Sequence, residues 1–401
     1  MEEKEIIEKM QQSIVIPDIV QEKVNSAFQR IDETNNKVTR IHSGNRKWKM
    51  MWIAIVAVTV ALGTTICAAA YIHLNSGLEA EFFMTQEKRQ FLEEHEYMSH
   101  ITNGDEMPSG VTAGGVTITP LQMISDSRFA WLSFKVEGYY LEKGVQPNFY
   151  SMSTVVDGNN QALVNSYAEF YKGRDYDGSL FFYEGGAPEK ETNGSHIENY
   201  VDEEGNMEYI IQIDGSRYEK GLIGSSVHVT LQDLGTWDYG EFSENLKAVW
   251  EFDIELKGSD EVRKVTLSEP LGDSGATVVY AEISPISFYV QYDFPLRKEP
   301  SDAIDGNGAV IASETFAKAP EFIGVRLKDG TYMMYIADCG VVGYRNESEN
   351  VYVAARASSR VIDTSQVDAL LFVKDIPIRQ HDGEYELIKE NLYIVPIETV
   401  E

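Results

Sequence analysis

The residues best suited to chemistry lie in three short motifs, and none has the spacing that its chemistry needs. Residues 272–275 (Gly-Asp-Ser-Gly) copy the nucleophile tetrapeptide of trypsin-like proteases, but the flanking glycine and proline and a matching histidine motif are missing. His95 and His100 are five residues apart, whereas a zinc-protease helix needs histidines four apart. Residues 302–308 faintly resemble a calcium loop without its closing glutamate. We therefore expect a turn at residues 272–275, a loop at residues 302–308, and no catalytic residue, metal site or cofactor.

The chain is strongly acidic, and the acidity lies beyond residue 76. Of 34 Lys/Arg and 64 Asp/Glu residues, the first 49 positions hold nine and eight and positions 50–76 hold none, which leaves 25 basic and 56 acidic side chains. A surface of this sign repels nucleic acid, so no nucleic-acid partner is expected. The two cysteines, Cys67 and Cys339, are unsuited to an intrachain disulfide, and so few cysteines fit an exported protein of a Gram-positive bacterium.

Residues 50–72 form an apolar run of 23 residues without a charge. As a helix this run reaches about 34 Å, enough to cross a hydrocarbon core of about 30 Å, so it predicts one transmembrane helix in the lipid bilayer. Arg46, Lys47 and Lys49 precede it, and positive residues stay in the cytoplasm. The sequence thus predicts a single-pass protein of the cell membrane with a cytoplasmic tail (1–49) and extracellular C-terminal domains. A cleavable signal peptide is the competing interpretation, but this leader is too long for one.

The tail contains one predicted amphipathic helix. After Pro17-Asp18, which favour a helix start, apolar residues recur at i, i+4, i+7, i+8 and i+11. This stripe consists of Val20, Val24, Ala27, Phe28 and Ile31. A short tail cannot bury the stripe by itself, so it rests on the membrane surface, pairs with a second copy or binds a cytoplasmic partner. We favour the partner.

Beyond the apolar run, residues 73–108 are predicted to form an extracellular helical stalk, and the period then changes to two. Residues 250–256 alternate most clearly, and Asp329-Gly330 is a strong hairpin-turn signal. Many short alternating strands indicate two antiparallel, immunoglobulin-like β-sandwiches. We place the first at residues 109–257 and the second at residues 258–401, because a Lys-Gly-Ser-Asp break begins at position 257.

This order of parts resembles a family of single-span Firmicutes membrane proteins catalogued as domain of unknown function 4179. The resemblance is carried by Ile16-Pro17-Asp18 with the basic cluster and apolar run, and by residues 115–119, 250–256, 283–286 and 362–367. It implies a role similar to that of anti-sigma factors, in which a cytoplasmic segment holds a sigma factor and the extracytoplasmic domains act as the sensor. Regulated proteolysis near the membrane would then release the sigma factor.

Two functions follow as hypotheses. The first is a membrane signalling regulator whose tail helix binds a cytoplasmic partner, such as a sigma factor, while the sandwiches sense a cell-envelope ligand. The alternative is a cell-surface binding module for wall polysaccharide or a peptide, without a signalling role. An enzyme ranks third, since no catalytic arrangement can be recognised among the seven scattered histidines.

Overall fold

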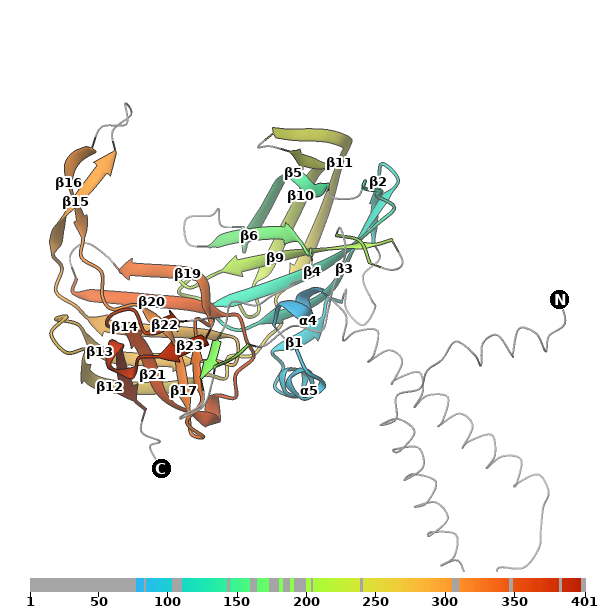
Figure 1. Cartoon of the computed structure of the whole chain (residues 1–401). Helices are drawn as coiled ribbons and strands as arrows, with labels where there is room; N and C mark the ends of the chain where they lie inside the picture. Colours follow the sequence, from blue (N-terminus) through green and yellow to red (C-terminus); the bar gives the residue numbers. More distant parts are fainter. Residues whose placement is uncertain are drawn as a thin grey trace, which may run out of the picture. The chain divides into compact units, whose positions relative to one another are not determined.

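The computed structural model describes most of the chain beyond residue 76. The described residues are 77–82, 84–102, 110–142, 145–158, 164–172, 180–182, 188–190, 200–202, 205–238, 241–304, 310–345, 349–381 and 384–397. All of them belong to the compact unit Ala68–Glu401. They are mainly β-strands, arranged as two sandwiches (Figure 1).

The first sandwich consists of two antiparallel sheets around one hydrophobic core. Its larger sheet has the order β1-β3-β4-β9-β6, with β2 beside β3, and its smaller sheet has the order β11-β10-β5. Trp250 lies fully buried between the sheets, and its indole N–H donates to the carbonyl of Val116 at 3.2 Å. The strands are β1 (Met98–His100), β2 (Val111–Ala113), β3 (Val116–Ser125), β4 (Phe129–Glu137), β5 (Gln146–Val156), β6 (Asn165–Phe170), β9 (Met207–Asp214), β10 (Ser226–Asp238) and β11 (Glu241–Glu255).

The second sandwich also has two sheets, of order β12-β13-β14-β20-β19 and β24-β21-β17-β18-β7-β8. Its core is rich in aromatic rings, among them Phe288, Tyr292 and Phe372. The strands of the first sheet are β12 (Arg263–Pro270), β13 (Thr277–Ile283), β14 (Ser287–Asp293), β19 (Ala337–Tyr344) and β20 (Val351–Ser358). Those of the second are β7 (Leu180–Phe182), β8 (Pro188–Lys190), β17 (Phe322–Leu327), β18 (Tyr332–Met334), β21 (Val367–Val373) and β24 (Leu392–Pro396).

Two separate hairpins and two 3-10 turns complete the second sandwich. The longer hairpin extends away from the sheets in Figure 1. The elements are β15 (Lys298–Ile304) with β16 (Val310–Phe316), β22 (Ile378–His381) with β23 (Glu384–Leu387), η2 (Thr364–Gln366) and η3 (Lys389–Asn391).

One hairpin joins the two sandwiches. β7 and β8 lie in the sequence between β6 and β9 of the first sandwich, yet β7 pairs with β18 of the second, with Tyr332 opposite Phe182. Main-chain pairing therefore connects the two sandwiches in addition to the direct passage from β11 to β12. Such a crossed connection cannot be read from alternation alone, since the pattern defines a strand but not its neighbour.

The predicted helical stalk over residues 73–108 is wrong. In its place are two short helices, α4 (Gly77–Glu81) and α5 (Gln86–Glu94), followed by β1, which pairs with β3. Leu78 and Leu92 are fully buried, and Phe82 meets Trp131 edge to face at 4.9 Å. The segment folds back because these apolar side chains pack in one buried cluster with Trp131 of the first sandwich and Ile286 of the second, whereas a projecting stalk would leave them in water.

The predicted fold class and membrane localisation also need correction. Among the described residues, no helix combines the length and apolar character that crossing a bilayer requires. The longer of the two helices has nine residues, about 14 Å, and is mostly charged. The predicted span (50–72) lies outside the described residues. The structure therefore gives the single-pass, cell-membrane arrangement no support, and the fold class is corrected from β-sandwiches on a stalk and span to a mainly β chain.

The strand predictions themselves agree with the structure. Along the end of β11, Trp250, Phe252 and Ile254 are buried while the intervening residues are exposed, as alternation requires. Asp329 and Gly330 form the turn between β17 and β18, where Gly330 adopts a φ of 89° and Asp329 accepts from the Thr331 amide. The two sandwiches have distinct hydrophobic cores. That they are separate domains with a boundary near residue 257 stays a prediction.

Candidate ligand-binding groove

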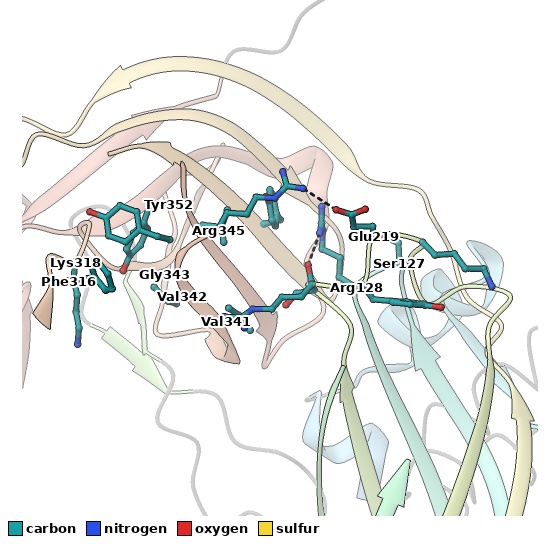
Figure 2. A pocket seen from close by; sticks show the side chains of 18 of the residues that line it. Ser127, Arg128, Glu219, Phe316, Lys318, Val341, Val342, Gly343, Arg345 and Tyr352 are labelled. Atoms are coloured by element: carbon teal, nitrogen blue, oxygen red, sulfur yellow. Dashed lines mark hydrogen bonds and ion pairs between the residues drawn. The ribbon is translucent and has the colours of Figure 1, made fainter. Parts of the chain in front are cut away.

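A groove of about 1200 Å³ lies where the two sandwiches meet. The first sandwich contributes the β3–β4 turn at Ser127-Arg128 and the β9–β10 loop. The second contributes the edge strand β19, parts of β14 and β20, and the chain that follows β16. Figure 2 shows Arg345 from the second sandwich and Glu219 from the first meeting across it, at 3.4 Å.

Arg128 fixes the floor of the groove. Its guanidinium donates from Nε and Nη2 to the Glu282 carboxylate of β13 at 2.9 and 2.5 Å, and it lies 3.9 Å from the centre of the Tyr289 ring. Both charged side chains are less than a quarter exposed, so solvent screens the pair only weakly. A paired, stacked arginine holds the two sandwiches at a defined separation and leaves little positive charge for a ligand.

The β9–β10 loop forms a wall held by many bonds. Its Gly215 and Leu222 amides donate to the carbonyls of Arg128 and Ser127 at 2.8 and 2.9 Å. Asp157 accepts from the Tyr218 hydroxyl at 3.0 Å, and its bond to Lys220 helps to hold its pKa far below the ordinary value. The loop is therefore preorganised, which lowers the entropic cost of binding a ligand against it.

The opposite wall rests on a cluster of aromatic rings. Tyr344 at the end of β19 packs edge to face on Tyr352 at 5.1 Å and on Phe316 at 5.8 Å, and it stacks on Phe294. Its hydroxyl donates to the Pro295 carbonyl at 2.9 Å, and burial raises the pKa of Tyr344. A packed aromatic base keeps β19 in place while its outer side remains accessible.

The groove gathers positive charge in an acidic chain. Five of the 25 basic residues beyond position 76 line it, namely Arg128, Arg217, Lys220, Lys318 and Arg345. Three of these have carboxylate partners, from Glu282, Asp157 and Glu219. In the described part of the chain, Arg217 and Lys318 have no such partner, and both are exposed. The groove with its partners therefore carries a net positive charge that an anion could neutralise.

The three short motifs of the sequence lie in a turn, on the surface and at the end of a strand. Residues 272–275 form the turn between β12 and β13, where the Ser274 hydroxyl accepts from the Ala276 amide at 3.1 Å. His95 pairs with Glu261 at 3.1 Å on the surface. Of the loop predicted at residues 302–308, the first three residues instead belong to strand β15, and residues 305–308 lie outside the described part. Within the described ranges, no group of three His, Cys, Asp or Glu residues could hold a metal ion.

The residues predicted to bind a cytoplasmic partner are not placed. Val20, Val24, Ala27, Phe28 and Ile31 lie outside the described residues, as do the orientation residues Arg46, Lys47 and Lys49. A sigma factor or other tail partner therefore stays a prediction. The groove itself was missed by sequence reasoning, because its cations are separated by up to 217 positions between Arg128 and Arg345. The sequence offered no clear signal for it, since Arg217 and Lys220 flank Glu219 and closer cation pairs, such as Arg263-Lys264, occur elsewhere in the same region.

Comparisons with known proteins leave the function open. No protein-family profile and no curated protein matches the chain. A solved structure described as a conserved domain protein from Bacillus anthracis aligns with 78% of this chain and 97% of its own, at 11% identity and a TM-score of 0.33. Agreement this loose establishes neither fold nor function. The resemblance to the family of domain of unknown function 4179 accordingly stays a prediction.

Proposed function

We propose that this chain is a binding protein without catalytic activity, and that the groove between its sandwiches holds an anionic ligand. The observation that carries this proposal is the pair Arg217 and Lys318, two exposed groove cations without a carboxylate partner in the described part of the chain. Arginine offers a planar fork that matches a carboxylate or phosphate, and lysine adds a mobile point charge.

The walls support the same proposal. Sites that bind ligands are concave and largely preformed, with a few polar groups that fix orientation. Here the β9–β10 loop is anchored through Asp157 and the facing strand through Tyr344, so neither wall needs to fold around the ligand. The acidic surface elsewhere repels anions and would direct them towards this cationic groove.

The test measures binding of two anionic probes to the full-length chain. One probe is the capped octapeptide (Glu-Val)4 and the other is tetragalacturonate, each carrying a fluorophore for anisotropy at about 50 mM salt, where screening is weak. We expect at least one to bind and the double variant R217Q/K318Q to bind it about tenfold more weakly, the loss of two charge-assisted contacts.

The matched control is the double variant K264Q/K374Q, which removes the same charge from two exposed lysines outside the groove. Its affinity should stay within about twofold of wild type, since a change in net charge alone acts weakly at a distance beyond the Debye length. Failure of both probes to bind, or equal weakening by the two double variants, would overturn the proposal.

A further inference from the structure

We infer that the groove binds an extended acidic peptide, which adds a strand to the free edge of β19. This inference rests on the proposed function and names its ligand class. Among the strands that the structure describes, β19 is the last of its sheet and pairs with β20 on one side only. Consecutive residues of β19 from Val341 to Tyr344 line the groove, so the groove includes the open edge as well as one face of the strand.

The hydrogen-bond register shows which groups of β19 face outward. The Arg345 amide donates to the Val351 carbonyl at 2.8 Å, and the pairing then runs without a shift from Tyr344 opposite Tyr352 to Gly340 opposite Arg356. In an antiparallel ladder, bonded pairs alternate with pairs whose N–H and C=O groups point away. The N–H and C=O groups of Val342 and Tyr344 therefore point to the free edge.

Beyond the register shift between Ala337 and Gly340, the C-terminal part of this edge lacks the devices that normally block strand addition. Natural edge strands carry lysine, proline or bulges that prevent pairing with another chain. The regularly paired part of β19 has the sequence Gly-Val-Val-Gly-Tyr at positions 340–344, without lysine, arginine or proline. Val342 is 40% exposed, and a Cβ added to Gly343 would meet no atom within 4 Å. A peptide backbone can therefore approach the strand closely.

The charges beside the edge select an acidic peptide. Arg345 follows β19 directly, and Lys318 and Arg217 line the same groove. In strand addition, main-chain bonds supply affinity and flanking side-chain contacts supply specificity. A peptide with carboxylates on alternate residues would place them on one face of the added strand, towards these cations. A cationic peptide would meet repulsion instead.

The test compares β19 variants of the full-length chain with the capped (Glu-Val)4 octapeptide as probe. Val342→Pro removes one outward N–H and places a ring at the edge, a position at which edge strands tolerate proline because the ladder to β20 is untouched. Val342→Ala removes the side chain but keeps the N–H. We expect Val342→Pro to weaken binding about tenfold or more and Val342→Ala to stay within about threefold.

Two further probes keep the inference testable if Val342→Pro does not fold. The first probe is the octapeptide with every second peptide nitrogen methylated, made in two versions, one methylated on the odd and one on the even residues. Each version keeps the charge but lacks the N–H donors along one edge of the extended peptide. At least one version should bind about tenfold more weakly than the unmethylated octapeptide. If both methylated peptides bind as tightly as the unmethylated octapeptide, charge alone attracts them and the inference is overturned. The capped (Lys-Val)4 peptide should bind at least about tenfold more weakly than its acidic counterpart.

The outcomes separate this inference from the proposed function. Binding of tetragalacturonate but not of (Glu-Val)4 would overturn the inference of a peptide ligand, while the proposed anion-binding function would stand. Absence of binding by either probe would overturn both. If sedimentation shows a dimer that Val342→Pro dissociates in the absence of peptide, a second copy of the chain occupies the edge and the peptide inference fails.

Discussion

The carboxylate of Asp126 in the first sandwich accepts a hydrogen bond from the Ser284 hydroxyl of the second, at 2.5 Å. The same oxygen accepts from Ser287 at 2.6 Å, and the other oxygen accepts from the amides of Arg128 and Phe129. Asp126 is 1% exposed. One buried carboxylate thus joins the two sandwiches and closes the β3–β4 turn, which contributes Ser127 and Arg128 to the groove, so groove geometry and stability of the joint are coupled.

We expect Asp126→Ala to lower the free energy of unfolding by about 3 kcal/mol. The change leaves two buried hydroxyls and two amides without their acceptor, and each loss of a bond to a charged group costs roughly 1.5–3 kcal/mol before relaxation. Urea denaturation of the full-length chain measures this change in the free energy of unfolding. Asp253→Ala removes a carboxylate whose side chain is 81% exposed and should cost less than about 0.5 kcal/mol. A loss of under about 1 kcal/mol for Asp126→Ala would contradict this role.

The pair of Arg128 and Glu282 should show measurable coupling. Because both are less than a quarter exposed and joined by two bonds, a double-mutant cycle to alanine should give an interaction energy of about 1–2 kcal/mol. The exposed pair of Arg297 and Glu299, at 3.3 Å, provides the comparison and should give less than about 0.5 kcal/mol. Equal values for the two pairs would show that burial does not strengthen the groove pair.

Stability should fall with rising pH because of Glu79. Burial raises the pKa of Glu79 to about 8, with a smaller raising contribution from Glu208, while Arg89 opposes the shift. In the unfolded chain this carboxyl releases its proton near its ordinary pKa of 4.5. Between pH 4.5 and 8 the folded state therefore binds more protons, and stability declines by up to about 1.4 kcal/mol per pH unit from this group.

The measurement compares unfolding free energies of wild type and Glu79→Gln from pH 5 to pH 8.5. Glu79→Gln cannot ionise, so we expect the wild type to lose stability relative to it as the pH rises, with the difference levelling above about pH 8. Glu87→Gln, which removes an exposed carboxyl at the start of α5, should run parallel to wild type. Parallel curves for Glu79→Gln and wild type would show that Glu79 does not titrate as described.

Trp250→Phe should destabilise the first sandwich by about 2 kcal/mol. The substitution removes the indole N–H bond to the Val116 carbonyl and leaves a small void against Phe149, whose ring centre lies 5.8 Å away. Thermal or urea unfolding followed by circular dichroism measures the change. Trp237→Phe alters a side chain that is 44% exposed and should shift the free energy by less than about 0.5 kcal/mol. Similar losses of unfolding free energy for the two variants would show that the buried Trp250 is no more sensitive to this substitution than the exposed Trp237.

The alternation of the sequence determined the strands and several turns. The Trp250 strand and the Asp329-Gly330 turn follow from local physics, because side chains alternate across a strand and glycine adopts positive φ at little cost. The same local reasoning misjudged the segment around Leu78 and Leu92 as a stalk. Its burial depends on Glu208, which accepts from the amides of Gly77 and Leu78 across 131 and 130 positions of sequence.

Only the tertiary structure determines where the groove lies and which residues line it. Arg128, Arg217 and Arg345 belong to three distant segments, and their convergence depends on the packing of one sandwich on the other through Asp126. The free edge of β19 was equally hidden, since alternation marks a strand without saying which strand lies beside it. Composition and period, being local, therefore determined that the chain is acidic and β-rich. Long-range contacts determined where its cations meet and which backbone groups remain open to a ligand.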